Sequence, residues 1–271
     1  MSKKIANLED YVREIRSIRP ARDELLLYRG HSDRRKCKLL PSVLREPNLV
    51  DSEHEILREL IASHPEEFAS DTTTLEQLAR AQHYSLPTRL LDATWNPLVA
   101  LYFASNDHDR TTGEVVVFRV KKSQVKFFDS DTVSCVANLA HLKLAERQAI
   151  DFSLTGEPFN EQQPVDRLLQ FIRVEKPYFR ARIVPKHLKT VLCVKPKRNS
   201  QRILVQAGAF LLWGIFEDLD RNTASGIRVE RIPVNGRKKT SLLRELDILA
   251  INESSMFPEI ERAAQYIRGK R

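Results

Sequence analysis

Apolar residues recur at helical spacing in three segments of the first third of the chain. In residues 7–18 they form one stripe, which predicts an amphipathic helix that ends before Pro20. A longer pattern over residues 49–68 predicts a helix that Pro65 breaks. Residues 73–84 predict another helix, because a threonine at the start and a glutamate nearby are typical of a capped N-terminus. The first of these helices is expected to act as a lid or strut.

Short apolar runs predict the strands. Residues 24–30 form such a run that ends in Arg-Gly, which places Arg29 at the end of a buried strand. Residues 113–122 give the clearest strand, because β-branched residues alternate through it. Further strands are predicted over residues 88–94, 190–196 and 202–216.

The remaining segments predict more helices. Asn96 and Pro97 give the cap and the first turn of a helix over residues 96–105. Further helices are expected over residues 132–150 and 165–176, and two near the C-terminus that join around Pro258.

This order of elements predicts the α+β class, with a central mixed β-sheet flanked by helices. The sequence contains no internal repeat, no low-complexity tract and no long linker, which favours a single domain. We expect an N-terminal helix in residues 1–23 and the α+β domain in residues 24–271.

Composition narrows the class of protein. The chain has 271 residues, 42% of them hydrophobic, which suffices for one large core. Its apolar runs, such as residues 209–216, are much shorter than the ~20 residues that cross a bilayer. The N-terminus is amphipathic and does not resemble a secretory signal. We therefore expect a cytoplasmic protein with no membrane partner.

The cysteines predict neither a disulfide framework nor a metal site. Cys37, Cys135 and Cys193 are far apart in the sequence, and no histidine stands at a spacing that suits zinc. They are interpreted as ordinary thiols.

Positive charge is in excess. Lysine and arginine number 44 against 36 aspartate and glutamate, which gives a net charge of +8. The excess is concentrated in segments such as residues 121–126 and 186–198. Solvated surface lysine explains this pattern, and so does a surface that faces nucleic acid.

One segment combines polar and apolar residues in an unusual way. Residues 81–105 read AQHYSLPTRLLDATWNPLVALYFAS. Unpaired polar atoms in a buried element cost about 1 to 3 kcal/mol each. The polar side chains of this segment must therefore pair with one another or bind a ligand. They include Gln82, His83, Thr88, Arg89 and Asp92.

These residues resemble the FRG domain family, which is named after a Phe-Arg-Gly motif. The resemblance rests on Tyr28-Arg29-Gly30, on AQHYSLPTRLLDATWNPLVALYFA, and on the later RILVQAGAF and MFP segments. The family segment is close to AQHxGLPTRLLDWTxNPLxALYFA. This chain departs from the family pattern at three positions: Tyr28 replaces Phe, Ser85 replaces Gly and Ala93 replaces Trp. Trp95 is a candidate to fill the space that the missing indole leaves.

The resemblance implies a setting more than a reaction. FRG domains occur in bacterial and phage-related proteins, some of which are thought to act as toxins or in phage defence. A weaker resemblance to ADP-ribosyltransferases implies a related fold, NAD as cofactor, a nucleic acid or acidic protein as target, and a neutralising antitoxin as partner.

In this interpretation Arg29 binds the pyrophosphate of NAD, because a guanidinium pairs with it through two hydrogen bonds and Gly30 lets the backbone come close. Loss of nicotinamide builds positive charge on the ribose, which favours a carboxylate or amide nearby. Gln206 stands where ADP-ribosyltransferases usually have glutamate on a late strand. The candidate catalytic residues are Arg29, His83, Asp92 and Gln206. The candidate cofactor-binding residues are Arg29, Gly30, Gln82, Thr88, Arg89 and Tyr102.

Structural roles remain open for the same residues. Arg29 has a possible buried ion pair with Asp92, and Arg89 has one with Asp33 or Glu24. His83 is a candidate helix C-cap. Two further residues have structural alternatives. Tyr102 is a candidate core residue together with Phe103, and Gln206 is a candidate partner for the polar groups at a strand edge.

The sequence therefore leaves two classes of function. An enzyme requires one deep pocket lined by Arg29 and His83. A non-catalytic nucleic-acid-binding or regulatory module requires a shallow basic stripe that includes Lys195, Lys197 and Arg198.

Overall fold

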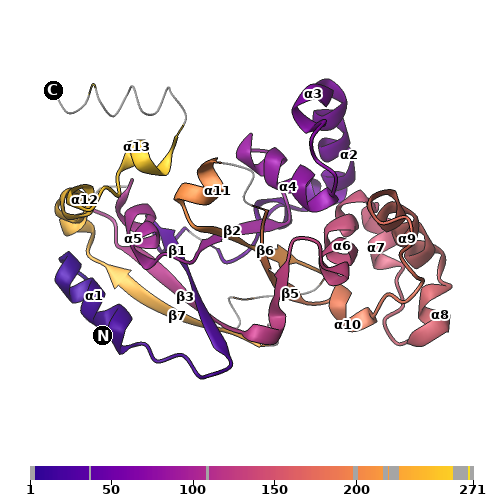
Figure 1. The fold of residues 1–271 in the computed structure, drawn as a ribbon, viewed down its shortest axis with the longest axis horizontal. Helices are drawn as coiled ribbons and strands as arrows, with labels where there is room; N and C mark the ends of the chain where they lie inside the picture. The colour runs from indigo at the N-terminus through magenta and orange to yellow at the C-terminus, as the bar shows by residue number, and fades with distance from the viewer. Residues whose placement is uncertain are drawn as a thin grey trace.

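A mixed β-sheet forms the centre of the structure, and helices cover its two halves (Figure 1). The computed structural model describes residues 4–36, 38–107, 110–197, 201–215, 219, 226–258 and 268. The strands are β1 (Glu24–His31), β2 (Leu90–Thr94), β3 (Gly113–Lys121), β4 (Val125–Phe127), β5 (Val191–Lys195), β6 (Gly208–Trp213) and β7 (Ile227–Val234).

The strands lie in the order β4-β5-β6-β2-β1-β3-β7. Strands β4 and β5 are parallel, and all the other neighbours in the sheet are antiparallel. The predicted α+β class with a central mixed sheet is confirmed.

Helices gather in two groups around this sheet (Figure 1). The helices described are α1 (Leu8–Ser17), α2 (Pro47–Ser63), α3 (Pro65–Phe68), α4 (Thr74–His83), α5 (Pro97–Ser105), α6 (Asp131–Ala137), α7 (Leu144–Gln148), α8 (Gly156–Asn160), α9 (Gln163–Glu175), α10 (Pro185–Leu188), α11 (Gln201–Val205), α12 (Lys239–Ile248) and α13 (Glu253–Met256). Within the described part of the chain, no helix has the length and apolar character needed to span a membrane.

Buried apolar side chains hold each group of helices to the sheet. One cluster joins α1, α5 and α12 to β1, β3 and β7. Another joins α4, α6 and α9 to β5 and β6. A third cluster packs side chains of the sheet itself, among them Leu27, Phe118 and Trp213.

The N-terminal helix α1 is part of the first of these clusters. The Asn7 side chain caps the helix by accepting a 2.8 Å hydrogen bond from the Asp10 N–H. Tyr11 is fully buried, and its hydroxyl donates to the carbonyl of Pro97, the first residue of α5, over 2.7 Å. Helix α1 thus supports α5, as expected for a strut.

Gly30 allows helix α5 to lie directly against strand β1. A Cβ atom at this position would lie 2.0 Å from the carbonyl oxygen of Ala100. The close contact with the backbone of α5 by itself requires glycine at position 30. Close approach of a pyrophosphate is therefore not needed to explain this residue. Gly30 nevertheless lines the smaller cavity described below.

Several predicted elements differ from those observed. Residues 202–216 are not one strand, because helix α11 comes first and β6 begins only at Gly208. The predicted helix over residues 132–150 consists of α6, a 3₁₀ turn and α7. The sequence analysis did not identify β4 and β7. The predicted helix after Pro258 lies outside the described residues.

The turn after α4 contains Ser85 in the left-handed region, with φ 66°. The Leu86 N–H donates to the Ala81 carbonyl and the Ser85 N–H to the Gln82 carbonyl, both over 3.0 Å. This pair of bonds is a Schellman motif, in which the residue at Ser85's position favours glycine. The FRG family pattern has glycine at this position, so Ser85 is a less favourable residue for the left-handed conformation that this turn adopts.

We predict that Ser85→Gly raises the free energy of unfolding by about 0.5 to 1 kcal/mol, because glycine relieves the left-handed strain at a smaller entropic cost. Urea unfolding measures the change. Ser52→Gly, inside helix α2, is the matched control and should destabilise by about 0.5 kcal/mol. A destabilised Ser85→Gly variant would contradict the prediction.

Candidate functional site

Two adjacent cavities lie beside strand β2. The larger, about 300 Å³, is lined by residues of α4, β2, α11 and β6. The smaller, about 140 Å³, is lined by residues of β1, β2, α5 and α11. Asp92, Ala93, Arg202 and Gln206 line both. The cavities therefore form a two-part site around the middle of β2.

The smaller cavity lies where strand pairing is interrupted. Strands β1 and β2 pair through one residue pair, Tyr28 with Thr94. Beyond this pair, Arg29 joins the strands, because its Nη1 donates to the main-chain oxygen of Asp92 over 2.5 Å. The Asp92 side chain itself is exposed. The possible buried ion pair between the Arg29 and Asp92 side chains is therefore wrong.

Behind Arg29, a buried chain of polar groups fixes its guanidinium. Arg29 Nε donates to His31 Nε2 over 2.9 Å, and His31 Nδ1 lies 3.1 Å from Glu114 Oε1. Arg231 Nη1 donates to the same carboxylate oxygen over 2.5 Å. Only the tautomer of neutral His31 with the proton on Nδ1 satisfies both of its contacts.

The pKa of His31 is consistent with this arrangement. Burial lowers it from the ordinary value of 6.5, and the positive charges of Arg29 and Arg231 lower it further. Glu114 opposes the shift through its hydrogen bond and its charge. A neutral His31 can therefore accept from Arg29, whereas a protonated ring would repel it.

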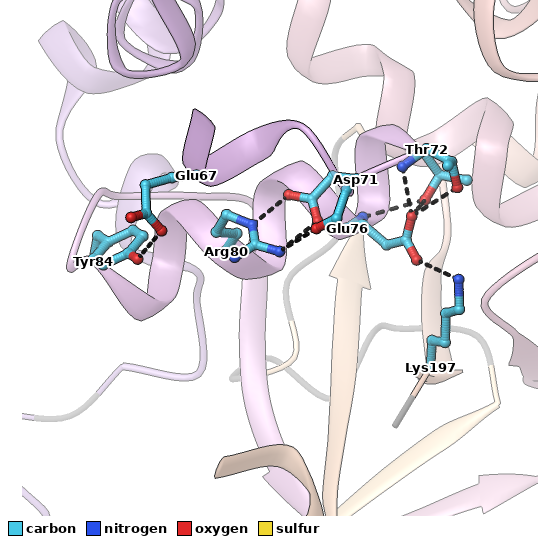
Figure 2. A network of polar contacts seen from close by, with 9 residues as sticks. Glu67, Asp71, Thr72, Glu76, Arg80, Tyr84 and Lys197 are labelled. Atoms are coloured by element: carbon cyan, nitrogen blue, oxygen red, sulfur yellow. Dashed lines mark hydrogen bonds and ion pairs between the residues drawn. The ribbon is translucent and has the colours of Figure 1, made fainter. Parts of the chain in front are cut away.

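Helix α4 supplies one wall of the larger cavity, and a network of polar contacts holds this helix in place (Figure 2). Arg80 makes two hydrogen bonds to Asp71, of 2.6 and 2.8 Å. Glu76 accepts from the main-chain and side-chain groups of Thr72 and lies 3.3 Å from Lys197 Nζ. The last contact ties α4 to the segment that follows β5.

The end of α4 brings two predicted site residues to the larger cavity. Gln82 is half-buried, and its Oε1 accepts a 2.7 Å hydrogen bond from Thr88. His83 is exposed and lies in the last helical turn, so that a contribution to helix capping is compatible with its place in the cavity wall.

Three predicted cofactor-binding residues line neither cavity. Thr88 is buried and holds Gln82 and the N–H of Leu90. Tyr102 is buried in the core beneath α5 with Phe103 against its ring. Arg89 is 1% exposed and belongs to another network. Thr88 is connected to the site only through its hydrogen bond to Gln82, which lines the larger cavity.

Arg89 forms a buried ion pair with Glu53 of α2. Its Nε and Nη2 donate to the two carboxylate oxygens over 2.8 and 2.6 Å, and Nη1 donates to the Trp213 carbonyl. Arg147 contacts the same carboxylate. The expected partners Asp33 and Glu24 are wrong. Arg89 therefore fastens α2 and α7 to the sheet and does not bind a ligand in these cavities.

Gln206 and Arg202 approach the site from the segment that was predicted to be a strand. Gln206 lies in the turn after α11, and its Nε2 donates to the Met256 carbonyl over 2.9 Å. The guanidinium of Arg202 lies 5.3 Å from the centre of the Phe257 ring. Arg202 was not predicted as a site residue, although it begins the RILVQAGAF segment. This segment was predicted to be a strand, and in a strand the Arg202 side chain would point in a different direction.

Ala93 occupies the position where the FRG pattern has tryptophan, and it lines both cavities. Ala93 and Trp95 both belong to the sheet cluster, so Trp95 stays a candidate to fill the space of the missing indole. It is half-buried, belongs to the sheet cluster, and packs against the ammonium group of Lys195, 5.4 Å from the ring centre.

Two residues of the basic stripe expected of the alternative function, Lys195 and Lys197, lie in the described part of the chain. Lys197 pairs with Glu76 and lines the larger cavity, while Lys195 lies over Trp95 and Phe127. Arg198 lies outside the described residues. No group of three or more His, Cys, Asp or Glu within the described part of the chain is arranged to hold a metal ion.

The cysteines described are buried thiols. Burial raises the pKa of Cys135 to about 12 and that of Cys193 to about 12. Cys37 lies outside the described residues.

The fold and the site thus define an α+β protein with arginine side chains around a two-part cavity. Residues 24–113 match the FRG domain, so the chain contains an FRG domain from β1 to the first residue of β3. The match includes Arg29 and the segment from α4 to α5. Comparisons with curated proteins and with solved structures found no match.

We predict that Arg89→Ala lowers the free energy of unfolding by about 3 to 5 kcal/mol, because it leaves the buried carboxylate of Glu53 with one partner fewer. Arg13→Ala, which removes an exposed ion pair with Glu9, should cost less than about 1 kcal/mol. Urea unfolding measures both. Equal losses in the two variants would contradict the assignment of Arg89 as a structural residue.

The lowered pKa of His31 predicts a dependence of stability on pH. Because the folded state favours the neutral ring, this contribution is present above about pH 6.5 and is lost as the pH falls through the lower folded pKa. His31→Gln keeps one donor and one acceptor without titrating. Between pH 7.5 and 5, wild type should therefore lose more unfolding free energy than the variant. Parallel pH profiles would show that His31 is not held neutral.

Proposed function

We propose that this FRG-domain protein binds NAD in the two-part cavity and transfers ADP-ribose from it to a macromolecule. The observation that carries the proposal is the position of Arg29. Its guanidinium lies in the wall of the smaller cavity, held by His31 and by the Asp92 carbonyl. Two further residues with charged side chains, Asp92 and Arg202, line both parts of the site.

Arg29 and Arg202 are the groups proposed to hold the pyrophosphate. Guanidinium groups donate in pairs to phosphate oxygens, and a side chain already fixed by other bonds loses little entropy when it binds. The Nε atom and one Nη atom of Arg29 bond to the protein, which fixes the plane of its guanidinium. Arg202 offers a second positive charge from the opposite element, α11.

Asp92 is proposed to stabilise the transferring ribose. Breaking the bond between C1′ and the nicotinamide nitrogen leaves positive charge on the ribose, while nicotinamide departs as a neutral molecule. A nucleophile of the target then bonds to C1′ and releases its proton. The exposed carboxylate of Asp92 carries the negative charge this step requires, and Gln206 offers an amide beside it. His83 is the candidate acceptor for the proton.

The cavity walls also contain apolar surface for the rings of NAD. Phe103 and Val99 border the smaller part, and Leu75 and Phe210 border the larger part. Binding sites for small molecules combine such surface with a few directed polar groups. The division into two parts suits a ligand with two ring systems joined by a charged linker.

The FRG domain supplies the proposed biological setting. We propose that the protein acts as a bacterial toxin or phage-defence effector in the cytoplasm, with a nucleic acid or an acidic protein as target. An antitoxin that neutralises it is part of this proposal. A non-catalytic, regulatory FRG module is the alternative, and it requires no NAD turnover.

Binding of NAD is expected to raise the melting temperature, because a ligand that binds only the native state stabilises it. Arg29→Lys keeps the charge but loses the bidentate geometry, so it should reduce the NAD shift and lower transfer at least about tenfold while changing stability by less than about 1 kcal/mol. Arg13→Lys on α1 is the matched control and should behave as wild type.

Asp92→Asn separates an enzyme from a binder. It should keep the NAD-induced shift and lose transfer of a labelled ADP-ribose group to a cell extract. Failure of millimolar NAD to shift wild type would contradict the proposal. A shift without transfer in wild type would favour the non-catalytic alternative.

A further inference from the structure

A third cavity, about 660 Å³, lies away from the candidate site. It is formed by the start of α6, the loop over residues 176–184 and helix α10, and it shares no lining residue with the other two cavities. In Figure 1, α6 and α10 belong to the group of helices opposite α1, α5 and α12. Its side chains include Asp131, Lys176, Tyr178, Arg180, Arg182 and His187.

Positive charge dominates this third cavity. Its carboxylate, Asp131, lies 2.7 Å from Lys176 Nζ and is neutralised by it. Arg180 and Arg182 are exposed, and their side chains make no ion pair or hydrogen bond with any other described residue. His187 adds a half-buried titratable group to the lining of this cavity.

Neighbouring lysines extend the charge. The pKa of His187 is lowered from 6.5, first by burial and then by the positive charges of Lys126 and Lys186. Protonation of His187, which would add a further positive charge to this cavity, is thus unfavourable. Like charges gathered without partners reduce the stability of the folded chain, so their concentration is better explained by an anionic ligand than by folding.

An exposed aromatic ring lies among these cations. Tyr178 is 97% exposed, so its ring contributes nothing to the core. A ring beside cations is the combination that binds single-stranded nucleic acid, in which bases stack on the ring and phosphates pair with the cations. A duplex does not offer its base faces, and an acidic peptide has no need of the ring.

We infer that this cavity is a docking surface for single-stranded nucleic acid, with Tyr178 stacking on a base and Arg180 and Arg182 pairing with phosphates. Lys126 and Lys186 extend the path of the backbone. The inference does not depend on NAD, because it rests on residues that line neither part of the candidate site. A failure of the NAD experiments leaves it unchanged.

Fluorescence anisotropy with labelled 12-residue oligo(U) and oligo(dT) tests the inference on the full chain. Wild type should bind at least one of them, with affinity that falls as salt rises from 50 to 200 mM. Arg180→Ala/Arg182→Ala should lower the slope of log affinity against log salt by about 1 to 1.5, since each phosphate contact contributes about 0.7. Tyr178→Ala should weaken binding about tenfold, and Tyr178→Phe should restore it.

The control is Arg13→Ala/Arg16→Ala, which removes the same charge from the exposed side of α1 and should leave the slope nearly unchanged. Equal effects of the two double variants would overturn the inference, because binding would then follow net charge alone. So would failure of wild type to bind either oligonucleotide at low salt. Equal competition by poly(Glu), with no effect of Tyr178→Ala, would assign the surface to acidic proteins and likewise overturn it.

Discussion

The interruption of pairing between β1 and β2 is the constraint on which the site depends. The two strands are held elsewhere: β1 pairs along its whole length with β3, and β2 pairs along its whole length with β6. Between them only Tyr28 and Thr94 are paired. A guanidinium takes over the connection, and the space that main-chain pairing would have closed becomes a cavity. An opening inside a sheet, rather than at a loop, gives the site rigid walls.

Arg29 and Arg89 have the same side chain but differ in their burial and in the groups to which they donate. Arg89 meets a carboxylate with two donors and is closed from solvent, so its charge is used within the protein. Arg29 donates instead to a neutral ring and a main-chain oxygen. The nearest carboxylate in the chain of contacts, Glu114, is already shared by His31 and Arg231.

Local signals in the sequence predicted local structure well. Asn96 caps its helix as expected, and the break at Pro65 falls where proline requires it. The site was only partly predictable, because long-range pairing decides it. Nothing in the spacing of Arg89 indicated Glu53, and the apolar run after Arg202 is equally compatible with a strand or a short helix. The family motif includes Arg29 and Asp92, but their contact through a main-chain oxygen follows only from the arrangement of the strands.

Different contacts determine the packing at position 93 and the position of Arg29. Ala93 lines both cavities and packs in the sheet cluster, whereas Arg29 is fixed by β1, β3 and β7 through His31, Glu114 and Arg231. Where the FRG pattern has tryptophan, the indole would have to fit into this same sheet cluster beside the residue at position 95. A change of the residue at position 93 would therefore alter the packing of the sheet cluster and leave the contacts of Arg29 as they are.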